Sequence, residues 1–498
     1  MSNASTMIPN DLITAELDGI YGATVLAEMG KIIQLYKVYE HGKDVVAEGT
    51  NGDYAAADLR FKQTRAIIDK EARFLFAKSP DIQIIDPIAD AGNKVAIDAI
   101  TSYNNLISAV LKANAFSRKI IQAAKDCFIG KRVACILNFH DVYGIGLRFI
   151  PSLEFIYDTD LQDPDKVTKI VAFYMLHDNQ AKGAQRIYKK KYWLGDDGYC
   201  WVEEAIYDGM GALVETVMDE TKTLLSFIPA VVIINDGLTS DVSGASEVDL
   251  LQDGEDWLTR LGNADIDAMR KGMNPIRYTI DMSNSSTEKL STAPGAYWDL
   301  ASDQNGASDD PKGSVGVLEA SLGYSDAMST TLTRIRSSML DQIDMPDIRE
   351  LDLKIASGKA LKAIYWGLIV RCDEKMLSWR PALEAMARMI IEGAKVYPNS
   401  AAVHMRGFVV SDMDYEVIVE NQYPLPEDEA EEKAVDIMEV NAQAMSRKTY
   451  MQKWRGLTDD EARAELQQIA MEGNMFDHSG MPPMGYAGAD GGGLTGEA

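Results

Sequence analysis

Phosphate binding is the first chemistry that the sequence suggests, at Ser357, Gly358 and Lys359. A nucleotide-binding P-loop requires a glycine five residues before its Gly-Lys pair, and a serine or threonine directly after the lysine to reach magnesium. Leu353 and Ala360 occupy these two positions. The sequence therefore excludes a P-loop, and no nucleotide cofactor is expected.

Metal binding is a second candidate, because four aspartates lie within residues 158–165. Their spacing is similar to that of a calcium loop, but an EF-hand also needs a glycine at its sixth position and a glutamate at its twelfth, and both are missing. The five histidines stand singly, and the four cysteines lie far apart without a Cys-x-x-Cys pair. We therefore predict a turn at residues 158–165 and no metal site.

The sequence supports neither covalent catalysis nor dinucleotide binding. Ser286 and Lys289 match a Ser-x-x-Lys pattern, but the companion motifs SDN and KTG of such enzymes are absent from the chain. Gly144 and Gly146 lack the third glycine of a dinucleotide fingerprint and indicate a hairpin. The sequence therefore predicts no catalytic residue and no cofactor, and the chain is not expected to be an enzyme.

Charge is the most informative property of the whole chain. The 498 residues contain 76 acids and 49 bases, which gives a net charge of −27. DNA-binding proteins gain affinity by neutralising phosphates with lysine and arginine, so this acidic chain is not expected to bind a DNA duplex tightly. Two explanations stay open: a charge that provides solubility, or a surface that lies near DNA without adhering to it.

The pattern of apolar residues predicts an α+β fold. Residues 1–130 have apolar positions at helical spacing. Residues 131–234 contain six predicted strands separated by Gly and Asp turns, which favours an antiparallel sheet: RVACILNF, GIGLRFIP, KIVAFYML, QRIYKKKYWL, YCWVEEAIYDG and FIPAVVIIN. The chain begins without a basic segment followed by an apolar run, so no signal peptide is expected. Its longest apolar run is too short to span a membrane. Assembly in a reducing cytoplasm is the simplest interpretation.

Two helices of similar length are predicted on either side of a small insertion. The helices cover residues 246–275 and 323–345, and the insertion, residues 276–322, is rich in Ser, Asp, Gly and Pro with a strand-like piece near each end. Each helix has an apolar stripe of the kind that packs against another helix, as an ordinary helical hairpin would also show. The stripes contain Leu250, Trp257 and Leu261 on the first helix, and Met328, Leu332, Ile335 and Met339 on the second.

The C-terminal part is predicted to be mainly helical. A charged segment, residues 346–356, precedes a long helix that starts near Ser357 and is kinked by Pro381. A strand pair is expected at residues 404–412 and 415–421. Two or three short helices follow at 426–478, and the last residues, 479–498, cannot bury enough apolar surface to order themselves.

This order of parts resembles the portal (head–tail connector) proteins of tailed bacteriophages, in the branch found in many long-tailed phages. Several phrases are similar to those of that family, and together they span nearly the whole chain. They are RAIIDKEARFLFAKSPDI (65–82), AAKDCFIGKRVACILNFHDVYGIGLRFIPSLEFIYDTD (123–160), ASGKALKAIYWGL (356–368), QYPLPEDEAEE (422–432) and AMSRKTYMQK (444–453).

The resemblance implies a portal-type fold with named parts. The wing would be residues 1–245, with helices followed by an antiparallel sheet, and residues 357–425, with the long kinked helix and the strand pair. Residues 246–275 and 323–345 would form a two-helix stem around the clip, residues 276–322. The crown helices would be residues 426–478, followed by a flexible tail at 479–498.

The resemblance also implies a role in the virion. The chain would form a homo-oligomeric ring, usually of twelve copies, at one vertex of the capsid, and double-stranded DNA would pass through it non-specifically during packaging and ejection. Its partners would be the terminase motor, a head-completion or tail adaptor protein, and the major capsid and scaffolding proteins, with no membrane contact. The alternatives are another ring-forming virion adaptor and an Asp/Glu-dependent hydrolase with a bound metal.

Residues 346–356 would form a loop that faces DNA in the tunnel of such a ring. Its bases could touch phosphates transiently, or they could equally form surface ion pairs worth about 0–1 kcal/mol each. The candidate residues are Asp347, Arg349, Glu350, Asp352 and Lys354, together with Lys359 just inside the following helix.

Overall fold

The protein forms two compact units in the computed structural model. The first contains Met1–Asp352 and Ile364–Pro424, and the second contains Leu353–Ala363 and Leu425–Ala498. The structure describes residues 8–17, 19–42, 56–87, 94–160, 162–163, 166–176, 186–237, 243–273, 276–280, 314–318, 323–347, 362–408, 411, 413–424 and 429–477.

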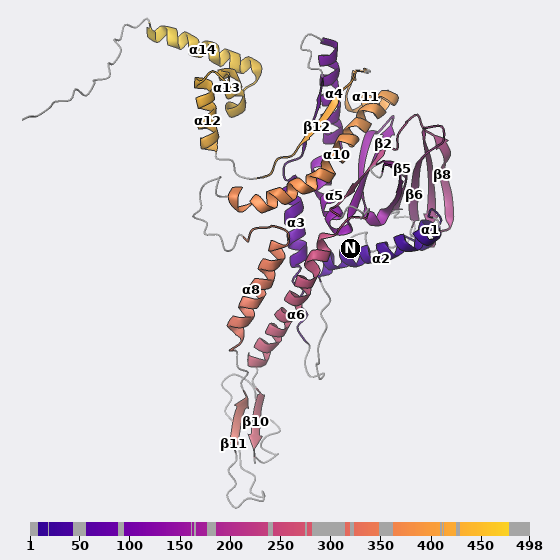
Figure 1. Cartoon of the computed structure of the whole chain (residues 1–498), viewed down its shortest axis with the longest axis vertical. Coiled ribbons are helices and arrows are strands. Elements are labelled where there is room, and N and C mark those ends of the chain that lie inside the picture. The colour runs from indigo at the N-terminus through magenta and orange to yellow at the C-terminus, as the bar shows by residue number, and fades with distance from the viewer. Residues whose placement is uncertain are drawn as a thin grey trace, which may run out of the picture. The chain divides into compact units, whose positions relative to one another are not determined.

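A layer of helices makes up much of the first unit. In α3 the apolar positions recur at helical spacing, and Ile67, Ile68, Leu75 and Phe76 are all buried. Figure 1 shows the strands β5 (Val167–Leu176), β6 (Arg186–Leu194) and β8 (Leu213–Lys222) to one side of α3, α5 and α10. The helices of this layer are α1 (Asn10–Thr14), α2 (Gly19–His41), α3 (Gln63–Phe76), α4 (Lys94–Ala113), α5 (Phe116–Gly130), α10 (Trp366–Val396) and α11 (Pro398–His404).

A three-stranded antiparallel sheet lies between two hydrophobic cores. It has the order β3-β2-β9, with β2 at Arg132–His140, β3 at Gly144–Pro151 and β9 at Ala230–Ile234. Along β2, Val133 and Cys135 belong to the core shared with the helices, whereas Ala134 and Ile136 belong to the core shared with the second sheet. Both faces of β2 are therefore covered, which explains why its sequence is a continuous apolar run.

The second sheet is a five-stranded antiparallel meander. Its order is β4-β5-β6-β7-β8, and the sequence predicts β5, β6 and β7 but neither edge strand. The strands are β4 (Phe155–Thr159), β5 (Val167–Leu176), β6 (Arg186–Leu194), β7 (Cys200–Asp208) and β8 (Leu213–Lys222). Helices and antiparallel sheets together agree with the α+β class expected from the sequence.

The predicted strand pair near residues 404–421 is wrong. β12 (Glu416–Glu420) does form, but it pairs with β1 (Asp81–Ile85), in a register that joins Ile82 to Val419. His404 ends α11, Arg406 and Gly407 form a turn, and residues 409, 410 and 412 of the predicted strand lie outside the described residues. The pairing joins segments more than 300 residues apart, so local sequence patterns could not reveal it.

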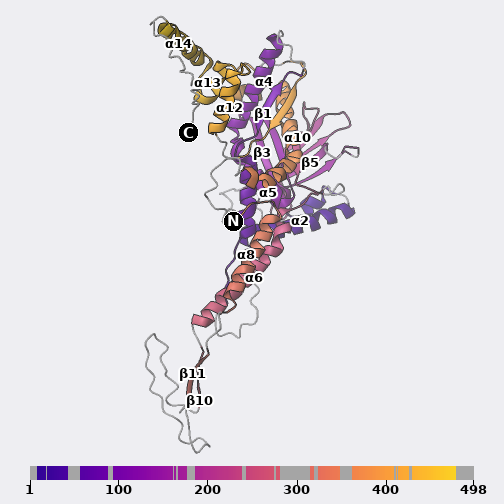
Figure 2. The ribbon, with the colours of Figure 1, turned by 60° about the vertical axis from the view of Figure 1, so that its left-hand side comes forward.

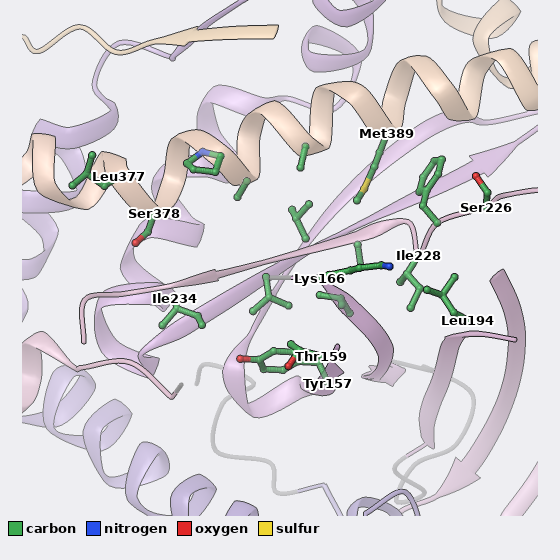
Figure 3. Close-up of a pocket in the computed structure, with 18 residues that line it drawn as sticks. Tyr157, Thr159, Lys166, Leu194, Ser226, Ile228, Ile234, Leu377, Ser378 and Met389 are labelled. Atoms are coloured by element: carbon green, nitrogen blue, oxygen red, sulfur yellow. The ribbon is translucent and has the colours of Figure 1, made fainter. Parts of the chain in front are cut away.

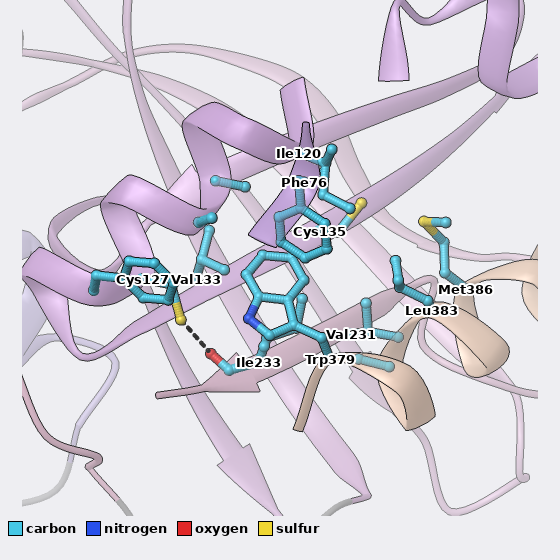
Figure 4. Close-up of a cluster of buried hydrophobic side chains, with 14 of the residues drawn as sticks. Phe76, Ile120, Cys127, Val133, Cys135, Val231, Ile233, Trp379, Leu383 and Met386 are labelled. Carbon is cyan, nitrogen blue, oxygen red and sulfur yellow. Dashed lines mark hydrogen bonds between the residues drawn. The ribbon is translucent and has the colours of Figure 1, made fainter. Parts of the chain in front are cut away.

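The main core is built where α3, α5, β2, β9 and α10 meet. Figure 4 shows Trp379 of α10 at its centre, and its ring meets that of Phe76 edge to face with centroids 4.9 Å apart. Cys127 Sγ lies 3.8 Å from the carbonyl oxygen of Ile233. All four cysteines of the chain are buried and free.

Two helices, α6 (Glu247–Met273) and α8 (Ser325–Asp341), lie within the ranges predicted for a helix pair and are here called the stem. Both views in Figures 1 and 2 show them side by side. Between them in the chain, β10 (Ile276–Ile280) and β11 (Ser314–Leu318) pair as antiparallel strands. The second helix ends at Asp341, earlier than Pro346, because a turn at residues 342–344 closes it.

The long helix α10 contains Pro381, as the sequence predicts. Proline has no N–H to donate to the carbonyl of Leu377, so the helix lacks one hydrogen bond there. A short helical segment at residues 362–364 and a turn at Tyr365 precede α10. The predicted N-cap, Ser357, lies outside the described residues.

The second unit contains α12 (Glu429–Asn441), α13 (Arg447–Arg455) and α14 (Asp459–Asp477). Ser446 caps α13, since its Oγ accepts a hydrogen bond from Thr449 N at 3.0 Å. Trp454 Nε1 donates to Asp436 Oδ2 at 2.6 Å, which joins α13 to α12. The predicted tail lies outside the described residues.

No helix in the described part of the chain has the length and hydropathy to cross a membrane.

Candidate functional site in the stem and at its root

Only one of the six predicted channel-loop residues is described. Asp347 lies near the end of the stem and pairs with Arg336 of α8, with 3.7 Å between Asp347 Oδ1 and the Arg336 guanidinium. Both side chains are largely buried, so Asp347 is fixed against the stem. The other candidates, Arg349, Glu350, Asp352, Lys354 and Lys359, lie outside the described residues.

The predicted stripe of α8 faces the interior of the chain. Met339 is buried against Gly254 of α6, and Leu332 and Ile335 are half-buried against the main core. Met328 is also half-buried. These side chains hold the two stem helices together within one subunit.

The predicted stripe of α6 has a different environment. Leu250 is 49% exposed and Trp257 is 54% exposed, and Leu261 is half-buried. The face that α6 buries within its own subunit contains polar residues. They are Glu255, Thr259 and Asn263, which lie beside Val248, Leu251 and Leu258. The apolar pattern therefore identifies a face of α6 that its own subunit leaves uncovered.

An extended segment explains why α6 buries polar side chains. Residues 56–62, here called the arm, run antiparallel to α6 and lead into α3. Asn263 Oδ1 accepts from Leu59 N and Asn263 Nδ2 donates to Leu59 O, both at 2.8 Å. Asp267 Oδ1 accepts from Ala57 N at 3.0 Å, and Glu255 Oε2 accepts from Thr64 N at 2.8 Å.

These contacts recur at intervals of four or eight residues along α6, so they lie on one side of the helix. Side chains of α6 thus take the place of a neighbouring strand in satisfying the backbone of the arm. The signal in the sequence is a polar series at four-residue spacing, Glu255, Thr259, Asn263 and Asp267.

A cluster of buried charges, here called the ionic junction, joins the stem to the helical layer. It contains Glu71 of α3, Glu247 at the start of α6, Arg371 and Lys375 of α10, and Asn235 after β9. Arg371 Nε lies 3.0 Å from Glu71 Oε1, and Lys375 Nζ donates to Asn235 Oδ1 at 3.1 Å. Arg371 and Lys375 both also pair with Glu247.

Burial controls the electrostatics of the ionic junction. The pKa of Glu71 is raised to about 7, first by burial and then by the charge of Glu247. Burial also works to raise the pKa of Glu247, but the charges of Lys375 and Arg371 lower it overall. Burial alone would lower the pKa of Lys375, yet the two carboxylates raise it. The junction is therefore a structural ion cluster with one weakly acidic member.

No motif in the sequence indicates the ionic junction. Glu71 stands between the apolar residues Ile68 and Ala72, and Lys375 stands beside Met376 in a buried helix. A charged residue on an apolar helical face is the signal that could have indicated it.

One cavity in the described part of the chain has a mainly apolar lining. It has a volume of about 450 Å³ and lies between α10 near Pro381 and strands β4 and β9. Figure 3 shows Leu377 and Met389 on the helix side, and Tyr157 and Lys166 on the opposite side. Among the residues that the structure describes, no three His, Cys, Asp or Glu side chains lie close enough together to hold a metal ion.

Replacing Glu71 with glutamine is expected to change how stability depends on pH. The pKa of Glu71 is about 7 in the folded chain against an ordinary value of 4.5. The folded chain therefore keeps a proton that the unfolded chain has lost, so the wild type loses stability as pH rises from about 5 to 7. We expect Glu71→Gln to gain about 2 kcal/mol relative to the wild type between pH 5 and pH 8.

Urea unfolding of both proteins at pH 5 and pH 8 measures this gain. Asp126 and Glu154, whose pKa values are raised to about 6 and about 7, contribute equally to both proteins and cancel in the comparison. Parallel pH profiles for the two proteins would contradict the prediction.

Gly254 is expected to tolerate no side chain, because α8 approaches α6 closely there. A Cβ at Gly254 would lie 2.5 Å from Met339 Cγ. Gly254→Leu should therefore lower the free energy of unfolding by about 1–3 kcal/mol through overpacking. Gly30→Leu in α2 is the matched control, since a Cβ there meets nothing within 4 Å. Thermal melting compares the two, and equal melting temperatures would refute the close approach.

Comparison with known families identifies the class of protein. Residues 21–477 match the family described as phage portal protein, SPP1 Gp6-like. The comparison with curated proteins found no match. The match leaves out only the two ends of the chain, and so includes the stem, the arm and the ionic junction.

The chain belongs to the SPP1 Gp6-like family of phage portal proteins. It is thus a phage protein of the virion, in the class of head–tail connectors. The family is a structural one, in keeping with a chain whose sequence predicts no catalytic residue.

Proposed function

We propose that this portal protein assembles into a ring of about twelve subunits at one capsid vertex, and that double-stranded DNA passes through the ring during packaging and ejection. The observation that carries the proposal is the family match over residues 21–477. The paired helices α6 and α8 support it, because a rod of two helices can stand beside identical neighbours around an axis.

The charge of the chain supports passage of DNA without tight binding. A duplex carries about one negative charge per ~1.7 Å of its axis, so a strongly basic wall would hold it in place. Each subunit instead contributes a net charge of −27. In this proposal the bases of residues 346–356 and Lys359 touch phosphates only transiently.

The proposed ring also docks other proteins. The clip at residues 276–322, which lies between the stem helices in the chain, would face the terminase motor during packaging and the tail adaptor afterwards. The wing would contact the major capsid and scaffolding proteins, and the crown at residues 426–478 would lie inside the head. Assembly would take place in the host cytoplasm.

Mass measurement and electron microscopy of the purified protein test the ring directly. Twelve subunits of 54.8 kDa would give a particle of about 660 kDa. We expect this mass by light scattering and a central hole in end-on images. A compact monomer at micromolar concentration, or a closed particle without a hole, would overturn the proposal.

A further inference from the structure

The arm carries two large apolar side chains that remain partly exposed in its own subunit. Its backbone is bound by Asn263 and Asp267 of α6, yet Leu59 remains 48% exposed and Phe61 42% exposed. Phe61 lies over Gly262, where an added Cβ would approach its ring to 2.4 Å. A segment whose backbone is held in place while its large apolar side chains stay partly exposed is suited to packing against another surface.

The uncovered face of α6 is a second apolar surface on the same stem. It contains the exposed side chains of Leu250, Trp257 and Ala264, and the half-buried side chain of Ala268 one turn closer to the C-terminus of α6. Gly262 lies under the arm, and Ala264 is two residues further, about 200° around the helix. The arm and the uncovered face therefore lie on opposite sides of α6.

We propose that the arm of one subunit packs on the uncovered face of α6 in the next subunit of the ring. The proposal rests on the ring proposed above and names the contact that closes it. A cyclic ring needs two different complementary surfaces on each subunit, so that every copy can offer one to each neighbour. Two surfaces on opposite sides of one helix meet this requirement.

The two surfaces match in size. Phe61 contacts Gly262 and Leu59 binds Asn263, so the bulky residues of the arm lie level with residues 262–263 of α6. At that level the uncovered face carries the small side chain of Ala264. Small residues there leave room for the rings and branches of a neighbouring arm.

The two surfaces also match in charge. Arg60 and Lys62 lie on the exposed part of the arm, at the end that leads into α3, and Arg60 also pairs with Asp58. Near its N-terminus, α6 carries the exposed acids Asp249 and Asp253, beside Leu250 and Trp257 of the uncovered face. The bases of one arm would therefore lie toward the acidic end of the neighbouring α6, which favours one register between the subunits.

Engineered disulfides test this contact. Phe61→Cys combined with Ala264→Cys should join neighbouring subunits, and non-reducing gels of the oxidised ring should show a ladder of covalent oligomers. The native cysteines give a low background because they are buried, and burial raises the pKa of Cys135 and Cys200 to about 12. Each single variant should stay monomeric on the gel.

Phe61→Cys combined with Ser329→Cys is the matched control. Ser329 is exposed on α8, the other helix of the same stem. A ladder from this pair instead of the Ala264 pair would overturn the proposal, because the arm would then pack on α8. Intact rings in which neither pair forms a ladder would also overturn it while leaving the proposed function standing.

The absence of rings in wild-type protein would overturn the proposed function as well. Circular dichroism melting of each variant confirms that the subunits are folded. A variant that melts early is replaced by Leu59→Cys with Ala268→Cys, for which the same ladder is expected.

Discussion

Replacing Lys375 with methionine is expected to lower the free energy of unfolding by about 3–5 kcal/mol, because it removes one of the two cations that compensate the buried carboxylates of Glu71 and Glu247. Lys375 is 1% exposed and pairs with Glu247, which is 2% exposed. Methionine fills a similar volume but donates no hydrogen bond, so Asn235 Oδ1 and Glu247 both lose contacts. Arg371 alone would have to compensate both Glu247 and Glu71.

Urea unfolding monitored by tryptophan fluorescence measures this loss, since Trp379 lies one turn further along α10. Lys395→Met is the control on the same helix: its partner Glu392 is 43% exposed, and such pairs contribute about 0–1 kcal/mol. A companion variant, Lys375→Met with Glu247→Leu, should recover part of the stability because the carboxylate is removed as well. Equal losses in the free energy of unfolding for Lys375→Met and Lys395→Met would show that the ionic junction stabilises the fold no more than a partly exposed ion pair does.

The parts of the fold that follow from the sequence are those that local patterns determine. β2 has a continuous apolar run, and Met339, which belongs to the apolar stripe of α8, is buried. β8 was missed because it is an exposed edge strand with charged residues throughout its second half. β12 was assigned the wrong partner because its true partner, β1, is distant in the chain.

The candidate site was harder to predict, because its key residues are polar and buried. An apolar pattern identifies the face of a helix that avoids water, whether its own subunit or a neighbour covers that face. In α6 the intrachain face uses Glu255 and Asn263 to bind the arm, so the apolar stripe at Leu250 and Trp257 lies elsewhere. The burial of Glu71 likewise depends on helices α6 and α10, which follow it by more than 170 residues.

The stem depends on two kinds of contact with the rest of its subunit. The ionic junction fixes the first turn of α6 to α3 and α10, and the arm binds α6 further along, as far as Asp267. Hydrogen bonds that need a defined geometry therefore hold α6 both at its first turn and along the stretch that ends at Asp267. We expect the stem and the helical layer to move together, because bending α6 between them would break buried hydrogen bonds.

Introducing an aspartate at Leu332 is expected to abolish the ring. Leu332 is half-buried on the face of α8 that packs against the main core, in line with Met339 and its contact to Gly254. A carboxylate there would be desolvated without a partner, at a cost of about 3 kcal/mol. The pair α6 and α8 should separate, and the surface that α6 offers to a neighbouring subunit would lose its support.

Thr330→Asp is the matched control, since Thr330 is exposed on the same helix and an added charge there remains hydrated. Light scattering and negative-stain images should show rings for Thr330→Asp and subunits or small oligomers for Leu332→Asp. Circular dichroism should show that the sheets and the helical layer of Leu332→Asp persist, because Leu332 lies at the edge of the main core. A full-size ring from Leu332→Asp would mean that subunits associate without a closed stem, and the wing or crown would then have to carry the assembly.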